Sequence, residues 1–135
     1  MEDKVQQFSE EFFGKSMEFL NLEFESVNDG VFVFSCEFNE MCSNPMGFVQ
    51  GGMITTALDD ATSAVMISGY KEKKAPMTTD LHVLFHRPLP LGKAMMEVKV
   101  IKLGQKSATS EGRIFNQENK SVSYTHLTLP TTRLV

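Results

Sequence analysis

The chain has 135 residues, which suits a single domain, and its formal net charge of −4 includes no block of like charges. Nucleic acid is therefore not expected as a partner. No apolar run is long enough to span a bilayer, and the acidic N-terminus lacks the basic start of a signal peptide. Two cysteines without metal-ligand spacing, Cys36 and Cys42, predict free thiols in a reducing compartment. We expect a cytoplasmic protein with no membrane partner.

The first part of the chain predicts a short helix followed by a hairpin. Apolar residues within 5–13 are spaced for one face of a helix. Residues 17–27 then place apolar side chains at every second position, which indicates a strand with one wet face. The Asn-Asp-Gly sequence at 28–30 is a turn signal, and alternation resumes in residues 31–39. The two strands should pair.

The rest of the chain predicts one long helix and four antiparallel strands. After a loop, the apolar period becomes helical from Gly51 to about Ser68. This helix has too many apolar positions for a surface element, so it must be covered on most sides. The fold class predicted is α+β, with a single antiparallel sheet of about six strands wrapped round one long central helix. The four later strands are expected at 77–88, 93–103, 107–117 and 121–129, with Pro130 ending the last.

The segment SNPMGFVQGGMITTALDD carries the most specific motif in the chain. Asn44 opens it, a Gln-Gly-Gly turn at 50–52 begins the helix, and Asp59 follows the second glycine by seven residues. This pattern resembles the hotdog-fold acyl-CoA thioesterases, closest to the phenylacetate-type (PaaI-like) branch of the 4-hydroxybenzoyl-CoA thioesterase superfamily. A strand that ends in Phe-x-Arg-Pro and two glycine turns extend the resemblance to about residues 17–120. The resemblance implies a hotdog fold and hydrolysis of acyl-CoA to a free acid and coenzyme A.

The resemblance also assigns the central roles. It implies that the N–H of Gly51 holds the thioester oxygen and that Asp59 acts as base or nucleophile across a dimer interface. A helix N-terminus has free N–H groups and positive potential, and glycine allows an acyl group to approach closely. Gly52 is expected to contact the substrate. The alternatives are that the glycines only shape a turn and that Asp59 is a solvated acid. Asp60 points about 100° away and is expected at the helix surface or an interface.

Four polar residues complete the expected site, each with a structural alternative. Asn44 either forms a turn or uses its amide to orient Asp59, a water or the thioester. Gln50 stands where many family members have His, and it can donate an N–H but cannot carry a proton. Thr78 lies where the family often has Ser or Thr near the acid of the partner chain, and Thr79 is expected beside the substrate. Both threonines are also ordinary strand residues.

No metal or cofactor is expected. His82 and His86 share a strand face, but no further ligands stand at suitable spacing, so we interpret both as structural or solvated. Arg87, Lys93 and Lys106 either meet the phosphates of coenzyme A or are solvated surface residues. The expected partners are the acyl-CoA substrate and a second copy of the chain, in a homodimer or a dimer of dimers.

The end of the chain has a second interpretation. Codons for residues 122–131 can be written as a transposon-end adapter of the kind used in sequencing libraries. We therefore expect a hotdog domain over residues 1–120 and interpret residues 121–135 as a non-native read-through tail that occupies the place of the last strand. The alternative is a genuine strand, because the segment alternates well.

Two further functions compete with thioester hydrolysis. A non-catalytic hotdog module would bind acyl-CoA and report it to a partner, and it would not need an acid near the thioester. A hotdog dehydratase would be expected to show an Asp-to-His pair in the helix region, and this chain has none there. The acid at position 59 favours the hydrolase.

Overall fold

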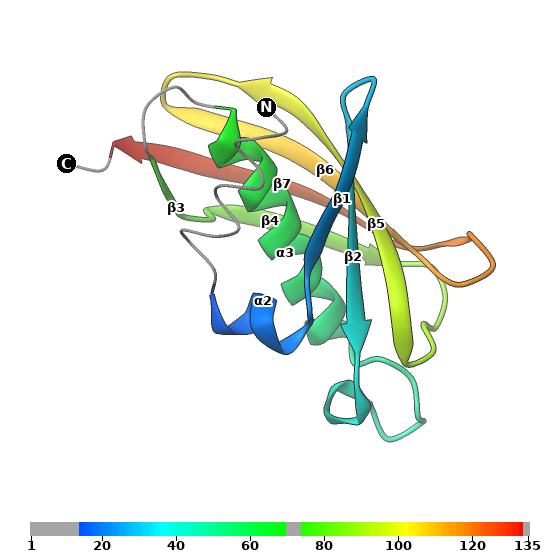
Figure 1. Cartoon of the computed structure of the whole chain (residues 1–135). Coiled ribbons are helices and arrows are strands. Elements are labelled where there is room, and N and C mark those ends of the chain that lie inside the picture. Colours follow the sequence, from blue (N-terminus) through cyan, green and yellow to red (C-terminus); the bar gives the residue numbers. More distant parts are fainter. Residues whose placement is uncertain (1–13, 70–73, 134–135) are drawn as a thin grey trace.

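The structure is a computed structural model that describes residues 14–69 and 74–133. The helix expected within residues 5–13 lies outside this part of the chain. The described residues form two α-helices, a 3-10 turn and seven strands (Figure 1). Their bounds are α2 Lys15–Phe19, β1 Glu23–Asn28, β2 Val31–Phe38, the 3-10 turn Glu40–Cys42, α3 Gly51–Ser68, β3 Lys74–Pro76, β4 Asp80–Phe85, β5 Gly92–Leu103, β6 Ser107–Phe115 and β7 Ser121–Arg133.

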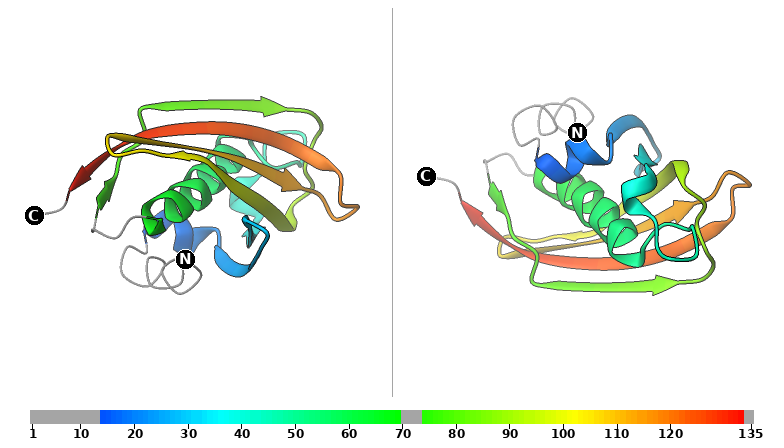
Figure 2. Two further views of the ribbon diagram at one scale, coloured as in Figure 1. Left: turned by 90° about the horizontal axis from the view of Figure 1, so that it is seen from above. Right: turned by 90° about the horizontal axis from the view of Figure 1, so that it is seen from below.

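One antiparallel sheet forms the body of the fold, in the order β1-β2-β5-β6-β7. The far edge of β7 pairs with β4 over residues 123–128 and with β3 over residues 131–133, so β3 and β4 share one strand position. The sheet curves round α3, and α2 lies on the other side of that helix (Figure 2). The fold class predicted from the sequence, α+β with one antiparallel sheet round a central helix, is confirmed.

The central helix is largely buried, and Gly112 on the sheet lets it lie close. Ten of its 18 residues are buried, among them Leu58, Ala61 and Thr62. A Cβ atom added to Gly112 of β6 would lie 3.0 Å from the Thr62 side chain and 3.3 Å from that of Leu58. Thr62 faces the sheet, and its hydroxyl donates a hydrogen bond to the Leu58 carbonyl. That hydrogen bond satisfies its polar group within the core.

The predicted hairpin forms, although its first strand is shorter than expected. Asp29 and Gly30 both have positive φ, 52° and 75°, as a two-residue turn between twisted strands requires. The strand expected over residues 17–27 begins only at Glu23, because residues 15–19 form α2. The apolar residues explain this difference. Met17 and Leu20 are buried and lie three residues apart, so they fit one helix face.

The final strand fills the interior position between β6 and β4, as expected of residues near 121–129. The prediction that Pro130 ends this strand is wrong, because β7 continues to Arg133. Pro130 is the last residue of β7 paired with β6, and it lies between the segments that pair with β4 and β3. A residue without an N–H can be placed where ladder partners change.

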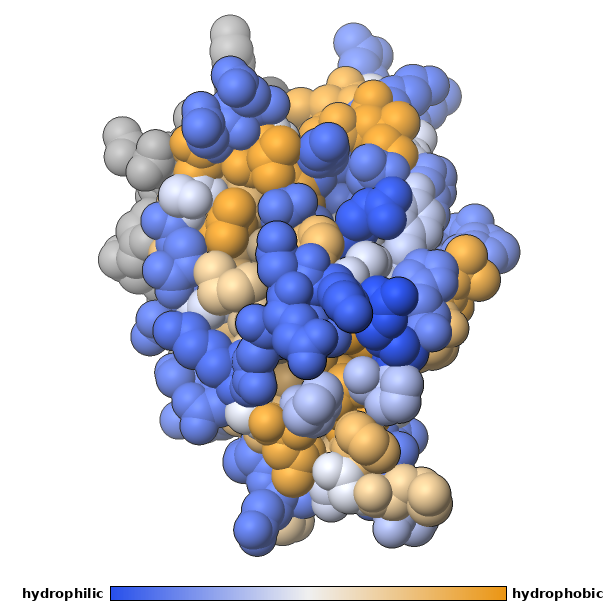
Figure 3. All heavy atoms as spheres, turned by 90° about the vertical axis from the view of Figure 1, so that its right-hand side faces the viewer, coloured by the Kyte–Doolittle hydropathy of each residue, from blue (hydrophilic) through white to orange (hydrophobic). Residues whose placement is uncertain are grey.

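The paired part of β5 and β6 carries charges of both signs on the outer face of the sheet. Glu97 and Lys99 of β5 are directly opposite Arg113 and Glu111 of β6, so each cross-strand pair joins opposite charges. Figure 3 shows hydrophilic side chains over the middle of the side of the molecule that is on the right in Figure 1. Opposite charges on neighbouring strands contribute to the stability of the sheet.

The strand expected over residues 77–88 is shortened to β4. Among the described residues, β4 pairs with β7 alone, which leaves its other edge open. Three large apolar side chains are exposed along or just before this strand, at Met77, Leu84 and Phe85. Within the described residues, neither helix is both long and apolar enough to cross a membrane.

Candidate active site

A cavity of about 520 Å³ opens beside the N-terminus of α3. Three segments that are distant in the sequence form its walls: the loop before α3, the first turn of α3 and the chain that leaves β4. The lining is mainly apolar, as in most small-molecule sites. It comprises Asn44, Met46, Phe48, Val49, Gly51, Ile54, Phe85, His86, Arg87, Pro88 and Leu89.

The N–H groups of Gly51 and Gly52 begin the helix. The first N–H groups of a helix have no intrahelical acceptor, and these two find none elsewhere in the described residues. Gly51 lines the cavity, so its donor and the positive end of an 18-residue helix lie beside the apolar space. Gly52 has another structural role. A Cβ there would lie 2.8 Å from Oε1 of Gln50, so the glycine leaves room for that side chain.

The Gln50 side chain caps α3. Its Oε1 accepts a hydrogen bond of 3.1 Å from the backbone N–H of Met53. This contact explains why a glutamine suits the residue before a helix, where side-chain acceptors are favoured. The amide nitrogen is not used by that bond. Gln50 is exposed and does not line the cavity, although its neighbour Gly51 does.

Asn44 organises the loop that forms one wall of the cavity. Its Oδ1 accepts hydrogen bonds from the backbone N–H groups of Met46 and Phe48, at 2.9 and 3.0 Å. The backbone N–H of Asn44 also donates to the Phe48 carbonyl at 2.6 Å. The side-chain oxygen thus acts as a turn former, one of the two roles expected. The side-chain NH₂ remains available as a donor at the cavity.

Asp59 lies away from the cavity. Its Oδ1 accepts a hydrogen bond of 2.9 Å from the hydroxyl of Thr78, and this bond forms within one chain. The resemblance implied instead a contact with the acid of a partner chain. Asp59 and Gly51 are eight residues apart, so the helix separates them by about 12 Å along its axis. A single chain therefore does not bring this carboxylate and the Gly51 N–H to one carbonyl group.

The neighbouring Asp60 lies under α2. Its Oδ2 accepts a hydrogen bond of 2.7 Å from the hydroxyl of Ser16. The pKa of Asp60 is raised from 3.8 to about 6, mainly by burial; the Ser16 hydrogen bond lowers it, and the charge of Asp59 adds to the rise. The sequence placed Asp60 at the surface or an interface. The structure shows an intramolecular contact, which depends on α2 folding back over α3 (Figure 2).

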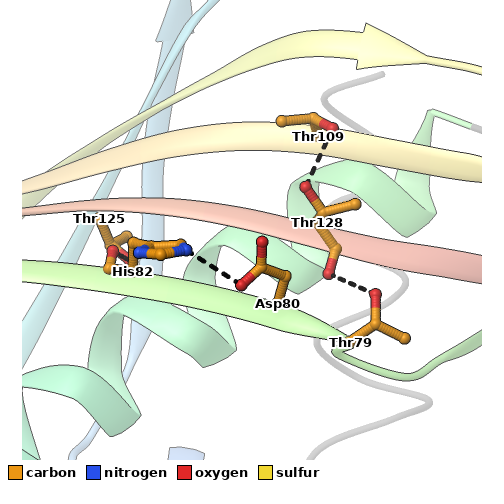
Figure 4. Close-up of polar contacts among 6 residues, drawn as sticks. All are labelled: Thr79, Asp80, His82, Thr109, Thr125 and Thr128. Atoms are coloured by element: carbon orange, nitrogen blue, oxygen red, sulfur yellow. Dashed lines mark hydrogen bonds and ion pairs between the residues drawn. The ribbon is translucent and has the colours of Figure 1, made fainter.

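Thr79 is tied to the sheet. Its hydroxyl donates to the Thr128 carbonyl at 3.2 Å, and the hydroxyls of Thr128 and Thr109 lie 3.2 Å apart (Figure 4). In the same view, Nε2 of His82 lies 3.2 Å from Oδ1 of Asp80. Neither Thr79 nor His82 lines the cavity. His82 is exposed, in agreement with its interpretation as a solvated residue.

Sequence reasoning missed the contribution of the segment after β4. His86 was interpreted as structural or solvated, and Arg87 as either a contact for the phosphates of coenzyme A or a solvated residue. Both line the cavity, and the Arg87 guanidinium also donates to the Ser121 carbonyl. Phe85 was noted only as part of the Phe-x-Arg-Pro pattern. That pattern was the signal that could have identified these residues, because it marks the end of the strand, where the chain turns away from the sheet.

The described residues contain no group of three side chains placed to hold a metal ion. The two cysteines are buried. Burial, and to a smaller extent the neighbouring Cys42, raises the pKa of Cys36 to about 12, so this thiol stays protonated at neutral pH. Because the thiolate is the nucleophilic form, Cys36 is not a candidate nucleophile.

Residues 46–123 match the family model of the Thioesterase superfamily, which is more than half of the chain. The protein belongs to the Thioesterase superfamily. Over 88 residues the chain is also 30% identical to a candidate esterase of Saccharolobus solfataricus; the match spans 65% of this chain and 58% of that protein.

Solved structures share the hotdog fold of this chain. A thioesterase of Haemophilus influenzae superposes with a TM-score of 0.86 at 19% identity, over 97% of this chain and 92% of its own. The PaaI protein from the phenylacetic acid degradation operon of E. coli gives 0.82 at 18% identity, over 98% and 95%. A Streptococcus mutans protein bound to acetyl-CoA gives 0.76 at 22% identity, over 85% and 91%. The resemblance to hotdog-fold thioesterases is confirmed.

Proposed function

We propose that the protein hydrolyses acyl-CoA thioesters, with the acyl group in the cavity and the thioester oxygen on the N–H of Gly51. The observation that carries this proposal is the position of that free N–H at the end of an apolar cavity. A preorganised donor in such a place stabilises the negative oxygen of a tetrahedral intermediate. The complex of the Streptococcus mutans neighbour with acetyl-CoA supports a coenzyme A thioester as the substrate class.

The carboxylate of Asp59 supplies the attack. As a base, it takes a proton from water, the water oxygen bonds to the thioester carbon, the C–S bond breaks and the thiolate of coenzyme A leaves. As a nucleophile, it bonds to the same carbon, the C–S bond breaks and the thiolate of coenzyme A leaves, and water then cleaves the resulting mixed anhydride to the free acid and the carboxylate of Asp59. The hydroxyl of Thr78 fixes Oδ1 of Asp59 in either case. The amide groups of Asn44 and Gln50 donate to the carbonyl or the water.

We further propose that a homodimer builds the site. Within one chain Asp59 is about 12 Å along the helix from Gly51, so the partner must bring its own carboxylate to the cavity. The open edge of β4 and its exposed apolar side chains supply a surface for a second copy. Unpaired strand edges are avoided in soluble proteins unless something covers them. The substrate would also contact Gly52, Thr78 and Thr79 in this assembly.

Asp59→Asn tests the chemistry. We expect turnover of acyl-CoA, followed with a thiol reagent, to fall by about 10² or more, while the affinity for acyl-CoA changes little. Asp60→Asn is the matched control, since it removes the same charge one residue further along the helix and should keep turnover. Wild-type rates in Asp59→Asn together with loss in Asp60→Asn would show that the acid is wrongly assigned.

Mixing two inactive variants tests the shared site. Asp59→Asn loses the carboxylate, and Gly51→Leu blocks the approach to the helix N-terminus. If each site takes one group from each chain, a mixed dimer keeps one intact site. Random exchange of subunits should then restore about a quarter of the wild-type activity. Activity no higher than the sum of the two variants, after exchange has been verified, would place each site within one chain.

A non-catalytic acyl-CoA-binding module is the second candidate. The side-chain oxygens of Asn44 and Gln50 both serve the backbone, which is what a purely structural motif would show. Tight binding of acyl-CoA without release of free thiol would favour this function. For either function we propose a cytoplasmic location, because Cys36 and Cys42 are unpaired and buried.

A further inference from the structure

Phe85 ends β4 in an unusual position. Leu81 and Val83 lie on the same side of the strand as Phe85, and both are partly buried. Leu81 packs against the core. Phe85 continues this inward series, but 52% of its surface is exposed and it lines the cavity. Leu84, on the opposite side of the strand, is 60% exposed and is not part of the cavity lining.

The Phe85 ring lies directly against the start of α3. A Cβ atom added to Gly51 would be 3.3 Å from Cζ and 3.5 Å from Cε1 of this ring. The Phe85 ring therefore occupies the space that a side chain at position 51 would need. Phe48, 36% exposed, and Met46, 79% exposed, line the same cavity. Exposed apolar side chains that gather round one space indicate a ligand site.

We propose that Phe85 is the residue that determines which acyl groups the site accepts. Its ring forms the wall of the acyl subsite nearest the Gly51 N–H. An acyl chain that fills the space beside the ring holds its thioester carbon at the donor, and a bulky or branched group collides with the ring. The ring also keeps water from one side of the donor, which strengthens the hydrogen bond to a developing oxyanion. This inference rests on the proposed thioesterase function, which it deepens.

The test compares Phe85→Ala and Phe85→Leu with the starting protein on a ladder of acyl-CoA substrates, from acetyl to branched and aromatic acyl groups. One methylene in an apolar pocket changes kcat/KM by about tenfold or more. We therefore expect Phe85→Ala to change the ratio of kcat/KM between bulky and small acyl groups by at least about tenfold in favour of the bulky ones, with Phe85→Leu between the two. For small acyl groups, Phe85→Ala should lower kcat as well as raise KM.

Leu84→Ala is the matched control, because it removes a similarly exposed apolar side chain from the next position of the same open strand. It should keep the selectivity ratio, and light scattering should show whether either variant alters assembly. An unchanged ratio in Phe85→Ala, or an equal change in Leu84→Ala, would overturn the inference while hydrolysis itself upheld the proposed function.

Binding of S-alkyl-CoA thioethers, which cannot be hydrolysed, separates the two proposals. A chain that cleaves no thioester but shifts its S-alkyl preference on Phe85→Ala supports the role of Phe85 and refutes the thioesterase proposal. A chain whose S-alkyl preference does not respond to Phe85→Ala refutes the role of Phe85 whether or not it is an enzyme.

Discussion

Asp60→Asn should stabilise the protein near neutral pH and should do so less as the solution becomes more acidic. The carboxylate lies under α2, and burial raises its pKa from 3.8 to about 6. Because the folded-state pKa is above the unfolded value, the folded state binds the additional proton between these two pH values. The contribution of this group to the free energy of unfolding is therefore most favourable below about pH 4, and it is lost as the pH rises through 6.

The size of the effect follows from the two pKa values. Each whole step of pKa corresponds to about 1.4 kcal/mol, so the charged carboxylate costs the folded state at most about 3 kcal/mol above pH 6. The side chain keeps some contact with water, which makes the true cost smaller. Asparagine is neutral at every pH and can still accept the hydrogen bond that Ser16 donates to Asp60. The variant therefore removes the cost of burying a charge and keeps the contact.

Urea or thermal unfolding of the two proteins at pH 4 and pH 8 measures this prediction. Equal protein concentrations are needed, because assembly would shift the midpoints. We expect nearly equal stability at pH 4 and a more stable Asp60→Asn at pH 8, with about 4 °C in Tm for each kcal/mol. Asp59→Asn is the control for loss of one negative charge from α3. A difference between Asp60→Asn and the starting protein that is the same at both pH values would refute the reasoning.

Three other predictions concern the site, the core and the tail. Gln50 does not titrate, so the pH profile of kcat/KM should show no ionisation near pH 6.5. An ionisation there that survives removal of His82 and His86 would count against the role assigned to Gln50. The hydroxyl of Ser110 is buried without a partner in the described residues, so Ser110→Ala should raise the free energy of unfolding by up to about 1–3 kcal/mol in urea titrations. We propose that residues 121–135 are a non-native tail, so a version with an apolar-alternating last strand should melt higher; equal melting would indicate a native strand.

The sequence predicted the elements whose pattern is local. The spacing of apolar residues in α3 and the Asn-Asp-Gly turn each specify a structure without reference to the rest of the chain. Prediction from the sequence failed where one pattern of apolar residues fits two structures. Leu20 belongs to an alternating series with Leu22 and Phe24 and equally to a helical pair with Met17, and only packing against the core decides for the helix.

The site was predictable in part for the same reason. Asn44 and Gln50 were each given a structural and a functional interpretation, and the side-chain oxygens follow the structural one because Asn-Pro turns and helix caps are local chemistry. The cavity was not predictable, since Phe85 and Gly51 are 34 positions apart in the sequence and meet only when β4 pairs with β7. Nor was the burial of Asp60, which depends on α2.

The two adjacent acids of α3 differ because the helix has three environments. The sheet covers one side, and α2 covers a second, where Asp60 meets Ser16. Between them remains a half-exposed strip with Thr55, Asp59 and Ser63, each four residues from the next and so on one line along the helix. Asp59 is thus the acid that a second molecule could reach. Because Gly51 lies about 12 Å away along the axis, we propose that the two-fold axis of the dimer passes close to this strip, so that each Asp59 faces the cavity of the other chain.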